Sequence, residues 1–188
     1  MKNSITKTLK SLEKTRSKFW NISSETGEFL NLLIKDRKIK KIFEIGASNG
    51  YSGIWIAEAL KETNGHLYTM ESNKNRYQLA LKNFEKSGLK KYITLIQGHA
   101  PEDIPKNFKK FDLIFFDATK YEHLSYLQSM LPHTKINTLI ITDNINSHKK
   151  ELSSYIKNIK SLKNWLTIKL NIGTGLLISY KLTKNSFT

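Results

Sequence analysis

Residues 43–52, FEIGASNGYS, decide the fold of this 188-residue chain, because they join an apolar run to a glycine-rich turn. A helical pattern follows the turn, and Glu71 ends the next apolar run, HLYTME, 25 residues after Gly46. In strand–turn–helix units of this kind, backbone N–H groups of the turn approach a ligand, and an acid on the next strand can bind two ribose hydroxyls. The segment therefore predicts a nucleotide-binding turn with its ribose-binding acid.

The spacing of the glycines distinguishes this turn from a dinucleotide site. It is Gly-x-x-x-Gly-x-x-Gly, whereas the dinucleotide pattern is Gly-x-Gly-x-x-Gly, in which the second glycine admits a pyrophosphate. Glu44, just before the turn, would repel phosphates but suits a positively charged group such as the amino group of S-adenosylmethionine. The alternative is a plain strand-to-helix turn in an α/β protein.

Length and composition indicate one domain spanning residues 1–188, with residues 1–22 as an N-terminal helical extension. The chain has no cysteine, which excludes a disulfide framework and thiolate metal ligands and fits a reducing compartment. No apolar run approaches the roughly 20 residues of a membrane span. We therefore expect a cytoplasmic protein with no membrane partner.

The charge of the chain is strongly positive. A net charge of +15 attracts polyanions such as RNA. The excess consists of 28 lysines and only 3 arginines, however, and arginine is the usual choice for bidentate phosphate recognition. Lysine enrichment from nucleotide bias in the genome therefore stays open beside a nucleic-acid partner.

Apolar runs and helical patterns alternate along the chain, which predicts an α/β fold with a doubly wound sheet. A closing hairpin through residues 172–175 adds an antiparallel last strand, so we expect seven mostly parallel strands with helices on both faces, the Rossmann-like layout of a class I methyltransferase. The predicted strands are residues 41–45, 67–70, 92–96, 111–116, 138–142, 165–170 and 176–182. The predicted helices are an N-terminal one through Ile5, Leu9 and Leu12, a second after the possible caps Ser23 and Ser24, and residues 52–60, 77–86, 124–131 and 152–162.

Acidic residues follow the ends of several predicted strands, and in a parallel sheet these ends meet at one edge. Asp117 follows the fourth strand, and Asp143 and Asn144 follow the fifth. Two carboxylates and an amide oxygen are hard ligands suited to Mg²⁺ first, with Mn²⁺ or Ca²⁺ as alternatives. Lys120 could act as a base beside them. The structural alternatives are a helix cap for Asp117, a turn at residues 143–144 and a solvated lysine.

Over residues 22–182 the chain resembles the cation-dependent O-methyltransferases, the family of catechol and caffeoyl-CoA O-methyltransferases. The resemblance rests on the Glu-x-Gly turn, Glu71, the Asp117-x-x-Lys120 motif and the Asp143-Asn144 pair. It also includes the segments SSETGEFL, residues 23–30, and IGTGLL, residues 172–177. The two-part metal motif is the specific element, because most methyltransferases share the Glu-x-Gly turn.

The resemblance implies a role for each motif residue. Glu44, Gly46 and Ser52 would contact the methionine portion of S-adenosylmethionine, and Glu71 would hold its ribose. His99 and Ala100 would lie along the adenine, although relatives commonly have an acid at the position of His99. The cation would be held by Asp117, Asp143 and Asn144. Lys120 would act as or assist the base, and Asp117 would count among both the catalytic and the cofactor-binding residues.

The segment after Asn144 bears on the acceptor. Relatives that methylate small phenols have an apolar, often tryptophan-containing loop there, whereas residues 145–150, INSHKK, lead directly into a helical pattern. An open, basic-rimmed site favours a bulky anionic acceptor, and some bacterial members of the resembled family methylate 5-hydroxyuridine in tRNA to 5-methoxyuridine. We expect this acceptor, with Trp20, Tyr51 and Tyr121 as aromatic residues that could stack a base or belong to the core or the rim.

Two other functions stay open. One is methylation of a small catechol or phenylpropanoid, with the pocket closed by the N-terminal helix or by the partner subunit of a homodimer. The other is a catalytically silent RNA-binding protein, against which the intact residues 117, 120, 143 and 144 argue.

Overall fold

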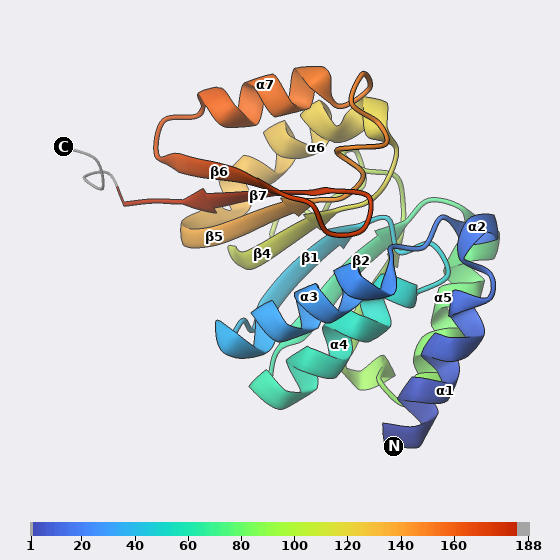
Figure 1. Ribbon diagram of the computed structural model, residues 1–188. Coiled ribbons are helices and arrows are strands. Elements are labelled where there is room, and N and C mark those ends of the chain that lie inside the picture. Colours follow the sequence, from blue (N-terminus) through green and yellow to red (C-terminus); the bar gives the residue numbers. More distant parts are fainter. Residues whose placement is uncertain (1, 184–188) are drawn as a thin grey trace.

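A computed structural model describes residues 2–183 of the chain as a seven-stranded sheet flanked by helices (Figure 1). The strand order is β3-β2-β1-β4-β5-β7-β6, and all described pairings are parallel except those of β7 with β5 and β6. This confirms the predicted sheet with its antiparallel last strand. The strands are β1 Lys41–Ile45, β2 His66–Glu71, β3 Ile93–Gln97, β4 Phe111–Phe116, β5 Thr134–Thr142, β6 Trp165–Leu170 and β7 Leu176–Lys181.

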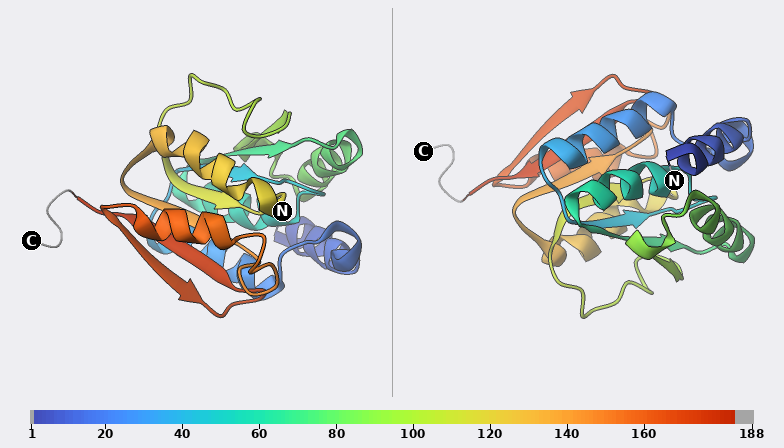
Figure 2. Two further views of the ribbon diagram at one scale, coloured as in Figure 1. Left: turned by 90° about the horizontal axis from the view of Figure 1, so that it is seen from above. Right: turned by 90° about the horizontal axis from the view of Figure 1, so that it is seen from below.

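Helices cover both faces of the sheet (Figure 2). One face carries α3, α4 and α5, with α1 packed outside against α5, and the other carries α6 and α7. The helices are α1 Lys2–Glu13, α2 Arg16–Phe19, α3 Ser24–Asp36, α4 Tyr51–Thr63, α5 Lys74–Ser87, α6 His123–Met130 and α7 Ser153–Ser161. None of them is long and apolar enough to cross a membrane, within the part of the chain that is described.

The continuous apolar runs of the sequence are the central strands, because both sides of β1 and β4 are covered by helices. Phe43 and Phe111 are fully buried on the α6 side, and Ile42 and Leu113 are fully buried on the α3 side. Burial of each such side chain contributes about 1.5–3 kcal/mol. This two-sided core makes the sheet a rigid base for the loops at its carboxyl edge.

The predicted alternation of strand and helix fails once. The connection from β3 to β4, residues 98–110, contains no helix and runs back as a loop along the face that carries α6, where Ile104 and Phe108 pack into the core. The strand predicted at residues 138–142 was also too short, because β5 begins at Thr134. A register shift against β4 and the left-handed backbone of Asn137 place residues 135–137 in an exposed bulge, and the polar Lys135 and Asn137 on either side of Ile136 broke the apolar pattern.

The N-terminal segment is folded onto the domain. Ile5 and Leu12 of α1 are buried in the core that includes α5, and the hydroxyl of Tyr51 donates a hydrogen bond to the Glu13 carboxylate. Ser23 caps α3 by accepting a hydrogen bond from the backbone N–H of Thr26 at 3.1 Å, as the sequence predicted. The domain predicted for residues 1–188 extends beyond the described residues at both ends.

Candidate active site

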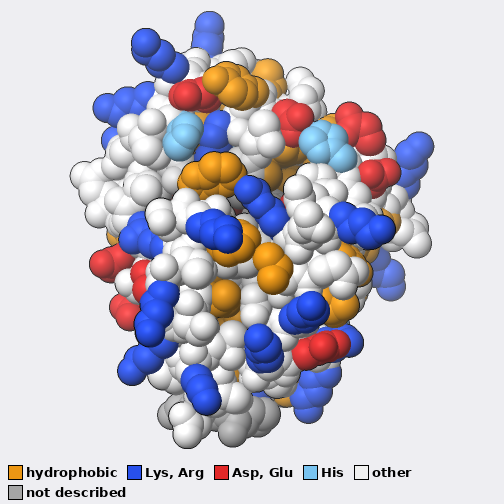
Figure 3. Space-filling model, turned by 90° about the vertical axis from the view of Figure 1, so that its right-hand side faces the viewer, with side chains coloured by type: hydrophobic (Ala, Val, Ile, Leu, Met, Phe, Trp, Pro, Cys, Tyr) orange, Lys and Arg blue, Asp and Glu red, His pale blue; other side chains and the backbone are white. Residues whose placement is uncertain are grey.

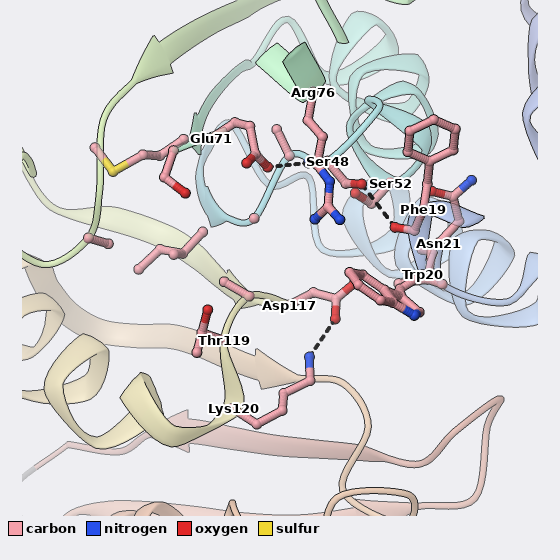
Figure 4. Close-up of a pocket in the computed structure, with 18 of the residues that line it drawn as sticks. Phe19, Trp20, Asn21, Ser48, Ser52, Glu71, Arg76, Asp117, Thr119 and Lys120 are labelled. Carbon is pink, nitrogen blue, oxygen red and sulfur yellow. Dashed lines mark hydrogen bonds and ion pairs between the residues drawn. The ribbon is translucent and has the colours of Figure 1, made fainter. Parts of the chain in front are cut away.

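A cavity of about 450 Å³ opens at the carboxyl ends of β1, β2 and β4 (Figure 4). Its walls come from the β1–α4 turn, the strand ends, the loop after β3 and the segment that joins α2 to α3. Of the residues predicted for the site, Gly46, Ser52, Glu71, His99, Ala100, Asp117, Lys120 and Asn144 line the cavity. Glu44 and Asp143 lie behind its wall with almost no exposed surface.

The turn after β1 depends on Gly46. Its φ of +104° is strained for any residue with a side chain, and an added Cβ would lie 2.4 Å from the backbone oxygen of Asp117. Ser48 also has a left-handed backbone, with φ of 48°. The turn can therefore approach the end of β4 closely. It brings Gly46, predicted to contact the cofactor, next to Asp117, predicted to bind the cation.

Glu71 uses both carboxylate oxygens to hold the turn. One accepts a hydrogen bond from the backbone N–H of Ser48 at 2.8 Å, and the other accepts from the backbone N–H of Asn73 at 2.9 Å. The side chain is buried yet borders the cavity. This fixes the carboxylate at the end of β2, where the sequence predicted the ribose-binding acid.

Glu44 is a buried carboxyl group with an incomplete set of partners. Thr69 of β2 donates a hydrogen bond to one oxygen at 2.5 Å, whereas the other oxygen has no hydrogen-bond partner. Burial raises the pKa of Glu44 to about 7, and the nearby hydroxyl groups of Ser52 and Thr69 oppose part of this shift. A positive charge brought to Ser52 from the cavity would favour the ionised form.

Asp117 and Lys120 form an ion pair in the wall of the cavity (Figure 4). The Nζ of Lys120 lies 2.8 Å from Oδ1 of Asp117, and both side chains are about seven-eighths buried. Burial raises the pKa of the Asp117 carboxyl, and the Lys120 ammonium opposes this shift. The structure therefore brings together the two residues of the predicted Asp-x-x-Lys motif.

Asp143 and Asn144 are joined by a residue from the distant end of the chain. The hydroxyl of Thr174 donates to Oδ1 of Asp143 at 2.8 Å and accepts from Nδ2 of Asn144 at 3.0 Å. This arrangement turns the amide nitrogen of Asn144 toward Thr174, so its carbonyl oxygen is free for another ligand. Burial, together with the charge of Asp117, raises the pKa of Asp143 to about 6.

This donor set fits a hard divalent cation. Asp117 and Asp143 are close enough for their charges to repel, and Asn144 supplies a third oxygen. Lys120 compensates one of the two carboxylates, so one negative charge is left without a cation. Within residues 2–183, no three histidine or acidic side chains cluster in a way that could hold a metal ion, and the third predicted ligand, Asn144, is an amide.

His99 and Ala100 line the cavity from the loop after β3. Asp103 holds the start of this loop by accepting a hydrogen bond from the backbone N–H of His99 at 2.8 Å. The Nε2 of His99 lies 3.2 Å from the Glu122 carboxylate, so an acid does stand beside the imidazole at this place.

Sequence reasoning missed Arg76 and the position of Trp20. Figure 4 shows both side chains at the cavity, and the Arg76 guanidinium lies 4.9 Å from the centre of the Trp20 ring. Trp20 is 71% exposed, although it lines the cavity. The exposed part of this ring offers a flat apolar surface to a planar molecule at the cavity. The sequence signal that could have indicated this position is a tryptophan three residues before Ser23, the cap of α3.

The cavity opens on a face with mixed charge. Figure 3 shows lysine and arginine side chains scattered over this face, with aspartate and glutamate among them and two histidines near the top. Lysines do not form a continuous ring around the opening. The basic rim predicted for this site is therefore only partly present.

Comparison with known proteins gives one family. A model of the O-methyltransferase family matches residues 2–171. Catechol O-methyltransferase of Niastella koreensis is 36% identical over 129 residues, covering 66% of this chain and 58% of that protein. Caffeoyl-CoA O-methyltransferase 1 of Zea mays is 37% identical over 146 residues, covering 72% of this chain and 56% of that protein. The chain thus spans less than 60% of the length of these curated relatives.

The fold is shared with solved structures. The O-methyltransferase from Bacillus cereus in complex with SAH superposes with a TM-score of 0.82 at 24% identity, covering 93% of this chain and 90% of that one. At this identity the likeness concerns the fold, which places the strand ends of the two proteins in corresponding positions.

Proposed function

This chain belongs to the O-methyltransferase family, and we propose from that premise that it transfers the methyl group of S-adenosylmethionine to a hydroxyl group that has a second oxygen beside it. The observation that carries the proposal is the meeting of two sets of residues in one cavity. The Gly46 turn and Glu71 form its cofactor side, and Asp117, Lys120 and Asn144 form the adjoining wall. A cofactor bound on the first set would present its methyl group to an acceptor held by the second.

The cofactor side suits S-adenosylmethionine. Glu71 accepts ribose hydroxyls in this proposal, and the segment of His99 and Ala100 lies along the adenine. The cofactor's ammonium group binds near Ser52, where its positive charge compensates the buried Glu44. The solved Bacillus cereus relative, which has the same fold, was determined with SAH, the demethylated form of this cofactor.

Asp117, Asp143 and Asn144 would hold a divalent cation, Mg²⁺ in the first instance, which would orient the two acceptor oxygens and make the hydroxyl more acidic. Lys120, after its ammonium group has released a proton to solvent, accepts the hydroxyl proton as a neutral amine, since its Nζ lies at the cavity wall beside Asp117. The resulting oxyanion attacks the methyl carbon, and the electron pair of the breaking carbon–sulfur bond stays on sulfur. Trp20 supplies an apolar surface beside this step.

The favoured acceptor is 5-hydroxyuridine in tRNA, whose O5 and O4 are adjacent oxygens. Two observations support a large planar acceptor. Residues 145–150 form a short series of turns before α7 and carry no aromatic wall, and Trp20 stands exposed at the opening. A base turned out of an RNA loop could stack on such a ring.

The second candidate is a small catechol or phenylpropanoid acceptor. The names of the curated relatives from Niastella koreensis and Zea mays favour it. A cavity of about 450 Å³ is in the size range of small-molecule sites and could hold part of the cofactor together with a phenol. In that case Trp20 and Arg76 would close over the phenol in place of the missing loop.

A methyl-transfer assay separates the candidates. Tritiated S-adenosylmethionine is supplied with bulk tRNA from a strain lacking this gene, with catechol, or with caffeoyl-CoA. Labelling of tRNA at a nucleoside that co-elutes with 5-methoxyuridine is expected. Labelling of catechol or caffeoyl-CoA alone would replace tRNA by the small-molecule acceptor. Labelling of none of them would favour a silent RNA-binding protein.

A further inference from the structure

A second recess lies among the segments that precede β1, β4 and β5. These segments lie at the edge of the sheet opposite the catalytic cavity (Figure 1). The volume of the recess is about 490 Å³, and its lining is dominated by basic side chains from three separate parts of the chain. We call it the basic groove. The basic residues that line it are Arg37, Lys38, Lys40, Lys41, Lys109, Lys110 and Lys135.

The groove contains one acid, and this acid is already engaged. The Asp112 carboxylate accepts hydrogen bonds from the backbone N–H groups of Lys40 and Lys41, at 3.0 and 2.9 Å, and its other oxygen lies 2.6 Å from Nζ of Lys135. Asp112 therefore fixes the start of β1 to β4 and compensates one lysine.

Some of the other basic side chains of the groove have a structural role within the fold. The Nζ of Lys41 bonds the backbone oxygen of Lys109 and lies 4.6 Å from the centre of the Phe111 ring. Lys110 donates to the backbone oxygen of Thr134 at 2.9 Å. Arg37 caps the end of α3, where the helix dipole favours a cation.

Lys38, Lys40 and Lys109 have no such explanation. All three are exposed, and none forms an ion pair or a side-chain hydrogen bond with another described residue. Elsewhere in residues 2–183 several lysines do pair with acids, as Lys35 does with Glu58 at 2.9 Å. Random enrichment in lysine would add cations evenly, whereas here they gather around a single engaged acid.

The gathered charges repel one another. Burial lowers the pKa of Lys41, and the charges of Lys109 and Lys135 lower it further. Lys181, which lies beside the groove, also has a pKa lowered by burial and by Lys110. A ligand carrying several negative charges would relieve this repulsion.

We propose that the basic groove binds the phosphate backbone of RNA, through Lys38, Lys40 and Lys109 as its principal contacts. Lysine ammonium groups on a concave surface contact phosphates as point charges without reading sequence. Membrane surfaces bind instead through cations combined with exposed apolar side chains. The apolar residues that line the groove, Ile39 and Leu139, are buried at 5% and 8% exposure, and Ile136, at 51% exposure, stands next to the lining residues Lys135 and Asn137. The lining itself thus offers a membrane almost no apolar surface, which favours RNA.

The groove and the catalytic cavity lie at opposite ends of strands of five to six residues, which is roughly 17–20 Å. A phenol cannot reach both sites, but an RNA stem-loop can. This step rests on the proposed function, because it makes the groove an anchor for the same RNA whose base enters the cavity. Binding in the groove itself does not require that RNA be methylated.

The test compares two triple variants that remove the same charge. The groove variant is Lys38→Gln, Lys40→Gln and Lys109→Gln. The control variant is Lys82→Gln, Lys157→Gln and Lys160→Gln, at exposed positions of α5 and α7. Fluorescence anisotropy measures the affinity of each full-length protein for labelled bulk tRNA at several salt concentrations. Calorimetry with SAH and far-UV circular dichroism check the cofactor site and the fold.

The groove variant should bind tRNA about tenfold or more weakly at 0.1 M salt. The plot of the logarithm of the association constant against the logarithm of the salt concentration should become less steep, its negative slope decreasing in magnitude by about two to three. The control variant should stay within about twofold of the wild type, and SAH affinity should be unchanged in both. Equal losses in the two variants, or no tRNA binding by the wild type, would overturn the proposal.

Two further outcomes are distinguishable. Binding to phosphatidylserine vesicles that the groove variant loses, while tRNA binding persists, would overturn the RNA assignment in favour of a membrane. Groove-dependent tRNA binding without methyl transfer to tRNA would keep the groove proposal and remove tRNA as the acceptor.

Discussion

At the residue scale, the site contains buried acids whose charges are only partly compensated. Glu44 has one oxygen without a partner, and Asp143 shares its surroundings with Asp117. Such groups destabilise the folded chain in their ionised form and favour ligands of positive charge. The cofactor's sulfonium and ammonium groups and a divalent cation are ligands of this kind.

Glu44 gives a prediction for stability. Its pKa is about 7 in the folded chain and 4.5 in the unfolded reference, so the folded state binds the proton more tightly. The wild type should lose stability as pH rises from about 4.5 to 7, by up to about 3 kcal/mol. The stability of the Glu44→Gln variant relative to the wild type should therefore increase as the pH rises over this range. Urea unfolding of both proteins at pH 5 and pH 8 measures the difference, and parallel pH profiles would contradict it.

Lys120 gives a prediction for chemistry. Lys120→Arg keeps a positive charge beside Asp117 but cannot serve as a base, because the guanidinium does not lose its proton. Turnover should fall about 10²- to 10⁴-fold with SAH affinity retained. Single-turnover rates and calorimetry provide the two readouts. A variant that methylates at nearly the wild-type rate would show that Lys120 only compensates Asp117.

A variant of Thr174 tests how the proposed cation ligands are positioned. Thr174→Val preserves shape but removes the hydroxyl that bonds both Asp143 and Asn144. We expect a 10- to 100-fold higher Mg²⁺ concentration for half-maximal turnover, with SAH affinity unchanged. Thr167→Val on β6, which removes a hydroxyl bonded to Ser179 of β7, is the matched control. An unchanged Mg²⁺ requirement would remove Thr174 from the site.

At the element scale, the turn after β1 joins the cofactor side to the acceptor side. Gly46→Ala places a Cβ 2.4 Å from the Asp117 backbone oxygen in a backbone conformation that alanine disfavours. The variant should lose at least about 2 kcal/mol of stability or shift the turn and lose SAH binding. Gly88→Ala, at the left-handed cap of α5, measures the cost of backbone conformation away from the site. Equal, small effects of both would show that the close approach is unimportant.

The elements also show what the sequence could and could not predict. The central strands and Gly46 were predictable because burial on both faces demands continuous apolar runs and the turn demands glycine. The start of β5 was not, because the bulge at residues 135–137 exposes its side chains. The contact of Thr174 with Asp143 spans 31 residues, and local patterns carry no signal for such a hydrogen bond.

At the scale of the whole molecule, the charge of +15 is not distributed as a basic rim around the cavity. Composition alone could not separate selected charge from general lysine enrichment. The fold separates them in part, because it gathers lysines from distant segments around Asp112 at the edge away from the cavity. The proposed catalytic cavity and the proposed RNA-binding groove thus lie at opposite ends of the strands of one sheet.

The most direct test of the central claim is methyl transfer from tritiated S-adenosylmethionine to the acceptor that the panel identifies, measured with Mg²⁺, after treatment with EDTA, and after Mg²⁺ is restored. Asp143→Ala is measured beside the wild type, with SAH affinity recorded for both. We predict that EDTA abolishes transfer, that Mg²⁺ restores it in the wild type alone, and that SAH still binds to both proteins. Transfer that continues undiminished in EDTA would contradict a reaction assisted by a cation at Asp117, Asp143 and Asn144.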